Sequence, residues 1–412
     1  MSAIKTFILG GAQTDFALNW NREGKEISDV LADSFQKALD ACSIELSEIQ
    51  SAHIGNFVAE LFCGQGQLGG VLVQAFPELT GISATRHEAA CASGSMAILG
   101  AMRDIEAGWH DLVAVSGVEL MRNVDGKTAS AYLGAAAWAG HEVQEAQYPW
   151  VSLFSDIRNY YHERFGVKDE HLAAIAKINY DNATRNPNAQ TRNWLLPEEY
   201  FTSDDHTNPL IEGTLRKSDC SRITDGSATV FLASEDFAKK YAQRTNIPFS
   251  DLPYIKGWGQ RTAPITLAQK LSVGHESAYP FPHLSGAISD AITRAGLSSA
   301  SELDAIETHD CFTISEYVAL EHFGLTAPGE AWKMLEDNTI AFRGSLPVNP
   351  SGGLIGAGHP VGATGVRMLL DAYKQTTDKA GAYQIENANN IGLLNIGGSF
   401  TTVASFVIGK NH

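Results

Sequence analysis

ALDACSIELSEIQSAHIGNF (38–57) has a counterpart in ITRAGLSSASELDAIETHDCF (292–312), and this repetition decides the fold. Each stretch combines an apolar-periodic helix, a Ser-rich turn, an acidic-apolar segment and a β-prone run. Aligning Ile49 with Leu303 sets an offset of 254 residues between the two copies. A supersecondary unit that occurs twice predicts two α/β halves built alike, with two unrelated helix–turn–strand units as the alternative.

Strand and helix signals alternate around the repeated unit, which favours a layered α/β architecture. Apolar runs predict buried strands at residues 4–9, 112–117 and 228–233, and helical spacing predicts helices at residues 26–41, 93–107 and 284–294. Residues 121–217 differ, because they are rich in aromatic, His, Asn and Arg side chains and lack a strand rhythm. We predict that this segment is a long insertion with at least two helices, folded over the first half.

Length and composition limit the class of protein. At roughly 150 residues per domain, the 412 residues predict two or three folded units. A chain that is 44% hydrophobic and 19% charged is not a disordered polymer. The formal net charge of −17 argues against nucleic acid as the main ligand, because phosphate binding requires clustered Lys and Arg.

The sequence also predicts a reducing, cytoplasmic environment. No apolar run approaches the ~20 residues of a membrane span, and the first residues, MSAIKTF, do not form a secretory signal. The scattered cysteines show no CxxC spacing, so we expect neither a disulfide framework nor a metal site. They are Cys42, Cys63, Cys91, Cys220 and Cys311.

Cys91 is the first candidate for chemistry, because HEAACASGS (87–95) leads directly into a predicted helix. Unpaired N–H groups at a helix N-terminus favour an anion, so this placement predicts a lowered thiol pKa and a nucleophilic thiolate. Small neighbours would let a substrate approach closely. The alternative is a small buried apolar residue, as most free cysteines are.

His359 is the second candidate, and it lies in the glycine-rich NPSGGLIGAGHPVGATG (349–365). An imidazole held on a rigid turn before Pro360 could act as a general base. Two alternatives stay open. The glycines loosely resemble a dinucleotide-binding fingerprint, although their spacing is irregular, or they form a structural turn in which the histidine is incidental.

Two further motifs follow predicted strands. HDCF (309–312) would place His309 as a hydrogen-bond donor and Cys311 as an acid/base thiol, unless it is only the end of a core strand. NIGGS (395–399) could point a backbone N–H at a developing oxyanion, or could be a plain turn. Together, two cysteines, two histidines and two glycine-rich turns indicate acyl transfer through a thioester-linked intermediate.

At this point the chain resembles the thiolase superfamily, and specifically its sterol-carrier-protein-2-type branch. The motifs that carry the resemblance are CASGS (91–95), NPNAQ (186–190), SDCSRITDGSA (218–228), HDCF (309–312), GHPVGATG (358–365) and NIGGS (395–399). It implies a five-layered αβαβα fold made of two βαβαβαββ halves with an inserted loop domain. We accordingly expect an N-terminal half at 1–120 plus 218–247, a loop domain at 121–217 and a C-terminal half at 248–412.

The resemblance also implies a role for each candidate. Cys91 matches the acylated nucleophile, His359 the base that activates it and Cys311 the second catalytic cysteine, while His309 would help to hold the thioester oxygen. The amides of Cys91 and Gly397 match an oxyanion hole. Where ordinary thiolases carry the second cysteine in their last motif, this chain has Asn395. The motifs do not identify the residues that would bind coenzyme A.

The function expected from this resemblance is that of an acyl-CoA C-acyltransferase, or thiolase, that condenses or cleaves 3-ketoacyl-CoA. The alternatives are a thiolase-like acyltransferase with a non-CoA acceptor, a retro-aldol lyase, which Cys91 disfavours, and a non-catalytic acyl-CoA-binding scaffold. Coenzyme A thioesters would be substrates, and no permanently bound cofactor is expected. Expected partners are a second copy in a homodimer or homotetramer and, as in some members, a small OB-fold, zinc-ribbon protein.

Overall fold

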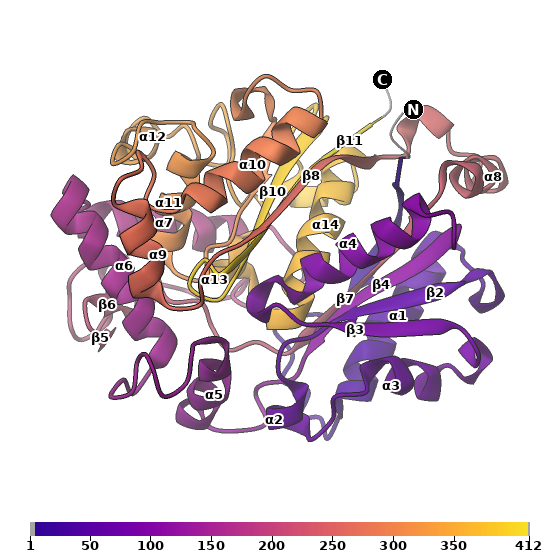
Figure 1. Cartoon of the computed structure of the whole chain (residues 1–412), viewed down its shortest axis with the longest axis horizontal. Coiled ribbons are helices and arrows are strands. Elements are labelled where there is room, and N and C mark those ends of the chain that lie inside the picture. The colour runs from indigo at the N-terminus through magenta and orange to yellow at the C-terminus, as the bar shows by residue number, and fades with distance from the viewer. Residues whose placement is uncertain (1–4, 411–412) are drawn as a thin grey trace.

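The computed structural model describes residues 5–410 and divides most of its elements between two similar groups (Figure 1). The first group comprises β1 (Phe7–Gln13), α1 (Ile27–Cys42), β2 (Ser51–Gly55), α2 (Ala59–Cys63), α3 (Leu68–Ala75), β3 (Ser83–His87), α4 (Ser93–Glu106), β4 (Leu112–Glu119) and β7 (Gly226–Ala233). The second comprises β8 (Tyr254–Thr262), α9 (Leu267–Gly274), α10 (Pro282–Arg294), β9 (Ala305–Glu307), α11 (Thr313–His322), α12 (Trp332–Glu336), α13 (Gly353–Ala357), α14 (Thr364–Thr376), β10 (Asn390–Gly397) and β11 (Thr402–Gly409). The helix α8 (Glu235–Thr245) connects the two groups.

The strand order of the main sheet is symmetric about its middle. Within the described residues, nine strands form this sheet in the order β3-β2-β4-β7-β1-β8-β11-β10-β9. From the centre outward, the first three pairings on each side are antiparallel, antiparallel and parallel. The two sides join where Phe7 of β1 pairs with Tyr254 of β8. This repeated pairing confirms the duplication predicted from the sequence.

The two copies of the repeated unit keep the offset predicted from Ile49 and Leu303. The short 3-10 helices Leu46–Glu48 and Ala300–Glu302 lie 254 residues apart, and β2 and β9 begin at the same offset. The predicted strands and helices are present with small shifts at their ends. The first strand begins later than expected, at Phe7, and residue 4 of that prediction lies outside the described residues.

The helices form layers with the sheet between them. α4 and α14 pack against each other and lie between the two sides of the sheet, whereas α1 and α3 cover the outer face of the first half and α10 that of the second. Apolar residues of α4 and α14, such as Ile98 and Leu369, share one core with strands of both halves. This arrangement confirms the five-layered architecture. None of the helices in residues 5–410 is long and apolar enough to cross a bilayer.

The second half departs from the expected βαβαβαββ order at its third strand. Where β3 stands in the first half, the second half has a single parallel bridge between Ile306 and Val348. Pro347 has no N–H to offer to a ladder, and Asn349 adopts a left-handed φ of 50° that ends the extended run. The chain turns away here, which brings the residues that follow to the candidate site.

The inserted segment packs mainly on the second half. It contains α5 (Gly126–Leu133), α6 (Pro149–Phe165), α7 (Asp169–Ala183) and a small hairpin of β5 (Leu210–Glu212) and β6 (Leu215–Arg216). α6 and α7 contact α11, and α7 also contacts α13, while α5 contacts α2. Asn179 of α7 donates hydrogen bonds to Glu316 (2.6 Å) and Asp310 (2.9 Å). The prediction that the insertion folds over the first half is therefore wrong for α6 and α7.

Candidate active site

Cys91 lies on the turn between β3 and α4. It is the middle residue of the 3-10 turn Ala90–Ala92, which leads directly into Ser93 at the start of α4. Ala90 has a left-handed φ of 51°, a conformation that costs a non-glycine residue about 1–3 kcal/mol. Ser93 holds the turn, because its hydroxyl donates to the Ala90 carbonyl (2.6 Å) and accepts from the Ala89 N–H (2.9 Å). The predicted position of Cys91 at a helix N-terminus is confirmed.

The expected lowering of the Cys91 pKa is wrong. Burial raises the pKa of this thiol to about 12, although the Gly398 N–H, which is hydrogen-bonded to the sulfur, acts in the opposite direction. Loss of water around a thiolate outweighs the favourable backbone groups here. Cys91 therefore rests as a neutral thiol and needs a base to remove its proton.

His359 lies on the turn between α13 and α14, and its two ring nitrogens have different surroundings. Nδ1 is 2.7 Å from the Thr364 hydroxyl, which itself donates to the Pro360 carbonyl (3.1 Å). The single hydroxyl proton is thus engaged, so Nδ1 must carry the ring proton and donate it to Thr364. Nε2 is buried and has no hydrogen-bond partner among residues 5–410. Burial, together with nearby Arg367, lowers the pKa of His359 to about 3, so that Nε2 is a free acceptor.

The glycines around His359 serve close packing. A Cβ on Gly356 would lie 2.5 Å from the Asn179 carbonyl oxygen, and one on Gly362 would lie 2.6 Å from the Gly55 carbonyl oxygen. Close packing against backbone therefore accounts for both glycines without a bound dinucleotide.

His309 follows β9 and is almost fully buried. Its Nδ1 lies 3.1 Å from the side-chain nitrogen of Asn395, which also donates to the carbonyl oxygen of Cys91 (3.1 Å). Its ring meets that of His359 edge to face, with centroids 5.2 Å apart. Burial, and then the neighbouring His359 and Arg367, hold the pKa of His309 well below its usual value, so this ring is also neutral.

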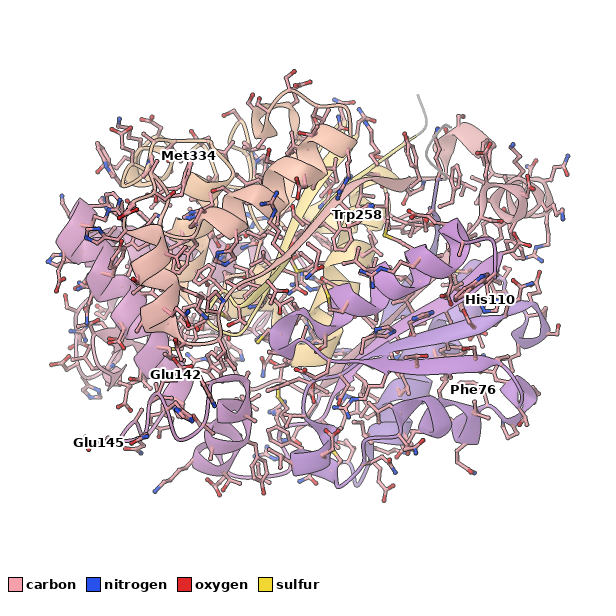
Figure 2. The ribbon with its side chains drawn as sticks, viewed as in Figure 1. Phe76, His110, Glu142, Glu145, Trp258 and Met334 are labelled. Atoms are coloured by element: carbon pink, nitrogen blue, oxygen red, sulfur yellow. The ribbon has the colours of Figure 1, made fainter. Side chains whose placement is uncertain are left out.

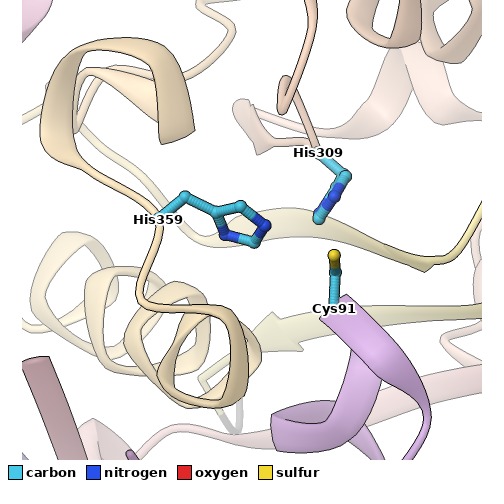
Figure 3. A group of neighbouring side chains, drawn as sticks. All are labelled: Cys91, His309 and His359. Atoms are coloured by element: carbon cyan, nitrogen blue, oxygen red, sulfur yellow. The ribbon is translucent and has the colours of Figure 1, made fainter. Parts of the chain in front are cut away.

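These three side chains from distant parts of the chain meet at one point (Figure 3). The Cys91 sulfur and one ring nitrogen each of His309 and His359 lie within 4.8 Å of one another. In Figure 3 the His359 ring is directed toward His309, and the Cys91 sulfur also faces His309. The structure thus places a neutral thiol, an unpartnered acceptor nitrogen and a second imidazole within reach of a single reacting atom.

An apolar cavity of about 360 Å³ opens onto this point. Cys91, His359 and Cys311 line it, together with side chains from the inserted segment and the first half, including Phe57, Met121, Leu133, Tyr148, Trp150 and Val151. The Cys311 sulfur is 3.8 Å from the Ser315 hydroxyl, and burial raises the pKa of this second thiol well above its usual value. Cys311 is therefore placed on the same cavity as Cys91 and carries a proton at rest.

The turn after β10 presents backbone amides to the site. A Cβ on Gly397 would lie 2.1 Å from the Ala89 carbonyl oxygen, so only glycine fits there. The N–H that contacts the Cys91 sulfur belongs to Gly398, one residue beyond the predicted donor. Phe400 completes the turn with a left-handed φ of 63°, which is unusual for a bulky residue. Gly397 as an oxyanion donor stays a prediction, and Gly398 adds a donor that faces the sulfur.

Glu119 is a site residue that the motifs do not reveal. Its buried carboxylate, at the end of β4, accepts hydrogen bonds from the N–H groups of Phe57 (3.0 Å), Val58 (3.2 Å) and Gly362 (2.9 Å). It thereby ties a loop of the first half to the turn that carries His359. Burial raises its pKa to about 7. The signal in the sequence was a lone charged residue at the end of an apolar strand.

Cys91, His309 and His359 are also the one group in the described residues whose donor atoms lie close enough to share a metal ion. A thiolate and two imidazoles would suit zinc. The thiol, however, is protonated at rest, and the lone pair of Nδ1 of His309 already accepts from the Asn395 amide. The expectation of no bound metal stays a prediction, and the geometry suits proton transfer.

Comparison with known proteins agrees with this geometry. Residues 6–236 match the family model for the thiolase N-terminal domain, and residues 269–410 match the thiolase C-terminal domain-like model. The acetyl-CoA acetyltransferase of Methanothermobacter thermautotrophicus is 32% identical over 98% of this chain and 99% of its own length. These matches span almost all of the described residues.

A second relative and a solved structure agree with these matches. Sterol carrier protein 2 of Oryctolagus cuniculus is 26% identical over 94% of this chain and 70% of its own length. The solved structure described as Ltp2-ChsH2(DUF35) aldolase has the same fold, with a TM-score of 0.78, 18% identity and coverage of 98% of both chains. The chain belongs to the thiolase superfamily, in its sterol-carrier-protein-2-type branch, and is an acyltransferase of thiolase type.

Proposed function

We propose that this enzyme condenses or cleaves 3-ketoacyl-CoA through an acyl group carried on Cys91. The observation that supports this most directly is the meeting of Cys91, His359 and His309 within 4.8 Å beside a cavity that Cys311 also lines. Acyl transfer needs a nucleophile, a base for its proton, donors for the carbonyl oxygen and a second proton carrier. Each requirement has a residue of suitable chemistry within this site.

In the cleavage direction, Nε2 of His359 takes the Cys91 thiol proton while the sulfur attacks the 3-keto carbon. The amides of Cys91 and Gly397 hold the 3-keto oxygen, and His309 holds the thioester oxygen. The bond between the 3-keto carbon and the α-carbon then breaks, and the Cys311 thiol gives its proton to the α-carbon, which releases acetyl-CoA and leaves the rest of the chain on Cys91. The thiol of free coenzyme A attacks the acyl-Cys91; its proton restores Cys311, and His359 returns its proton to Cys91.

The cavity favours an acyl group larger than acetyl. Its volume of about 360 Å³ and its lining of Phe57, Leu133, Trp150 and Val151 suit an apolar chain rather than a two-carbon unit. Burial of each methylene in such a cavity is worth about 0.8 kcal/mol. We therefore propose that kcat/KM rises with chain length until the cavity is filled.

We further propose that the enzyme is a cytoplasmic homodimer or homotetramer. β3 is the last strand on its side of the sheet, so its outer edge is available for pairing with a second copy. Each of the cysteines, all of which lie in the described part of the chain, is free, as suits a reducing compartment. The aldolase neighbour is named with a DUF35 component, and a small OB-fold, zinc-ribbon partner stays a proposal for this chain.

The test is a panel of 3-ketoacyl-CoA, 3-hydroxyacyl-CoA and acyl-CoA thioesters, with cleavage followed by absorbance and the protein followed by intact-mass spectrometry. We expect thiolysis and an acyl adduct on Cys91, which Cys91→Ser abolishes and the control Cys63→Ser retains. Label on another cysteine would overturn the assignment. An adduct without thiolysis would favour a non-CoA acceptor, cleavage of 3-hydroxyacyl-CoA without an adduct would favour a lyase, and binding without chemistry would favour a scaffold.

A further inference from the structure

Asn395 connects the two sides of the site, because its side chain contacts both Cys91 and His309. Its oxygen accepts from the Ser95 hydroxyl (2.7 Å), and its nitrogen donates to the Cys91 carbonyl oxygen (3.1 Å). A carbonyl oxygen has no proton to donate, so the contact with Cys91 sets which end of the amide faces it. The NH₂ end therefore faces His309 as well, 3.1 Å from Nδ1.

This contact determines where the proton of His309 lies. An amide NH₂ can only donate, so Nδ1 of His309 must be the unprotonated nitrogen and the ring proton is on Nε2. Within residues 5–410, no carboxylate is hydrogen-bonded to the ring. The adjacent Asp310 accepts instead from the N–H groups of Leu354 (2.6 Å) and Ile355 (3.1 Å), and the ring faces His359.

We propose that Asn395 is a positioning residue that holds His309 in its neutral Nε2–H form, so that His309 presents an N–H donor to the oxygen of a thioester bound over Cys91. The proton position stands on the hydrogen bonds alone, while its effect on catalysis rests on the function proposed above. Because the same amide donates a hydrogen bond to the Cys91 carbonyl, Asn395 sets the position of His309 relative to Cys91. His359 is in the opposite neutral form, with its proton on Nδ1, and the centroids of the two rings are 5.2 Å apart.

The first experiment observes the proton directly in the full-length protein labelled with ¹⁵N-histidine. Long-range ¹H–¹⁵N correlation spectra distinguish the two neutral forms of a ring, and His309→Gln identifies the signals of His309. We expect an unprotonated Nδ1 and a protonated Nε2, unchanged between pH 6 and 8. In Asn395→Asp the new carboxylate accepts from Nδ1, so the proton should move there or a second proton should be gained. An Nδ1–H ring in the unmodified protein would overturn the proposal, whatever the enzyme catalyses.

The second experiment asks whether Asn395 acts through His309. Removal of one preorganised oxyanion donor costs about 10²–10³ in kcat, so Asn395→Ala and Asn395→Asp should lower the rate of Cys91 acylation by at least tenfold. In a His309→Ala background, the same substitutions should change the rate less than threefold, that is by under about 0.7 kcal/mol. Ser405→Ala is the matched control, because it removes a buried hydroxyl that donates to the Leu393 carbonyl of β10 (2.9 Å) and does not contact the Asn395 amide, so it should have little effect.

The two measurements separate the ways in which the idea could fail. Equal losses from Asn395→Ala with and without His309 would show that Asn395 supports the fold or Cys91 instead, and would overturn the positioning role. Should Asn395→Asp not fold, Asn395→Ala still tests the proposal, because its His309 signals should show a mixture of both neutral forms. A retained single Nε2–H form in Asn395→Ala would mean that another group sets the proton.

Discussion

At the scale of single residues, the site assigns opposite tasks to two similar histidines through their Nδ1 partners. The Thr364 hydroxyl, already donating to Pro360, forces Nδ1 of His359 to donate and leaves Nε2 as an acceptor. The Asn395 amide instead makes Nδ1 of His309 an acceptor. Both rings are neutral because burial lowers their pKa. One neighbouring side chain therefore decides the task of each ring. Thr364 leaves His359 as the base, and Asn395 leaves His309 as the donor to the substrate oxygen.

Thr364→Val tests this assignment for His359. Valine keeps the shape of threonine but removes the oxygen that accepts from Nδ1, so the ring loses its preference for an unprotonated Nε2. We expect the rate constant of Cys91 acylation to fall roughly tenfold, less than the 10²–10⁴ that complete loss of a general base costs. Stopped-flow kinetics measure this rate constant directly. Thr376→Val, at the other end of α14, is the control; an equal loss there would point to damage to the helix instead.

Cys311→Ala tests the second thiol. Cys311 carries its proton at rest, because burial raises its pKa, and it lines the cavity beside Cys91. We expect the acyl adduct on Cys91 to form normally in this variant, while carbon–carbon bond cleavage or formation falls by about 10²–10⁴. Mass spectrometry follows the first step and thiolysis the second. Cys220→Ala, which alters another thiol of the same cavity, should retain both; near-normal thiolysis by Cys311→Ala would reduce Cys311 to a packing role.

At the scale of elements, the turn between β10 and β11 is held by a buried lysine of α9. Lys270 is 2% exposed and donates to the Ile265 carbonyl (2.8 Å) and to the hydroxyls of Ser399 (2.8 Å) and Thr401 (2.7 Å). The start of α9 is fixed in turn by Glu142, labelled in Figure 2, which accepts from the Leu267 N–H (3.1 Å). These contacts hold the turn whose Gly398 amide faces the Cys91 sulfur.

The charge of Lys270 predicts a pH dependence of stability. Burial lowers its pKa to about 7, against 10.5 for an ordinary lysine. Between these values the unfolded chain binds one more proton, so the free energy of unfolding rises with pH, by at most about 1.4 kcal/mol per pH unit. In urea unfolding from pH 6 to 9, the free energy of unfolding of wild type should increase relative to that of Lys270→Met above pH 7. The exposed Lys37→Met should keep a constant difference from wild type; a constant difference for Lys270→Met as well would contradict the shifted pKa.

Local sequence patterns predicted the elements and the candidate residues. The hydrogen-bond partners, the burial of Cys91 and the packing of the insertion depend on the three-dimensional structure and could not be predicted from them. The copies around Ile49 and Leu303 could be recognised because helix, turn and strand signals are local. Asn395 and Lys270 drew no such prediction, since their roles depend on partners far away in sequence, such as His309 for Asn395. The pKa of Cys91 was predicted with the wrong sign because the sequence shows the helix end but not the burial. The helices α6 and α7 of the insertion were placed on the wrong half because the partners of Asn179 lie more than 130 residues onward.

At the scale of the whole molecule, the two halves share their central core and form the site between them. Cys91 comes from the first half, and His309 and His359 come from the second. Strands of both halves pack on α4 and α14, with Val115 and Leu393 in the same cluster as Ile98 and Leu369. A core shared in this way should make the halves unfold together and should couple the geometry of the site to the stability of the whole chain.

Gly117→Ala tests that coupling at a close contact between the halves. A Cβ at this position of β4 would lie 2.3 Å from the Gly362 carbonyl oxygen and 2.7 Å from the Cα of Ala363, both on the turn that carries His359. Overpacking of this kind costs about 1–3 kcal/mol. Calorimetry should show one transition at a lower Tm, and hydrogen exchange should show β4 and β10 losing protection together. Gly70→Ala, on the open side of α3, is the control, and we expect it to be neutral or stabilising by up to about 1 kcal/mol. Two resolved transitions, or loss of protection in β4 alone, would mean that the halves are independent and that the site is held together only by its own contacts.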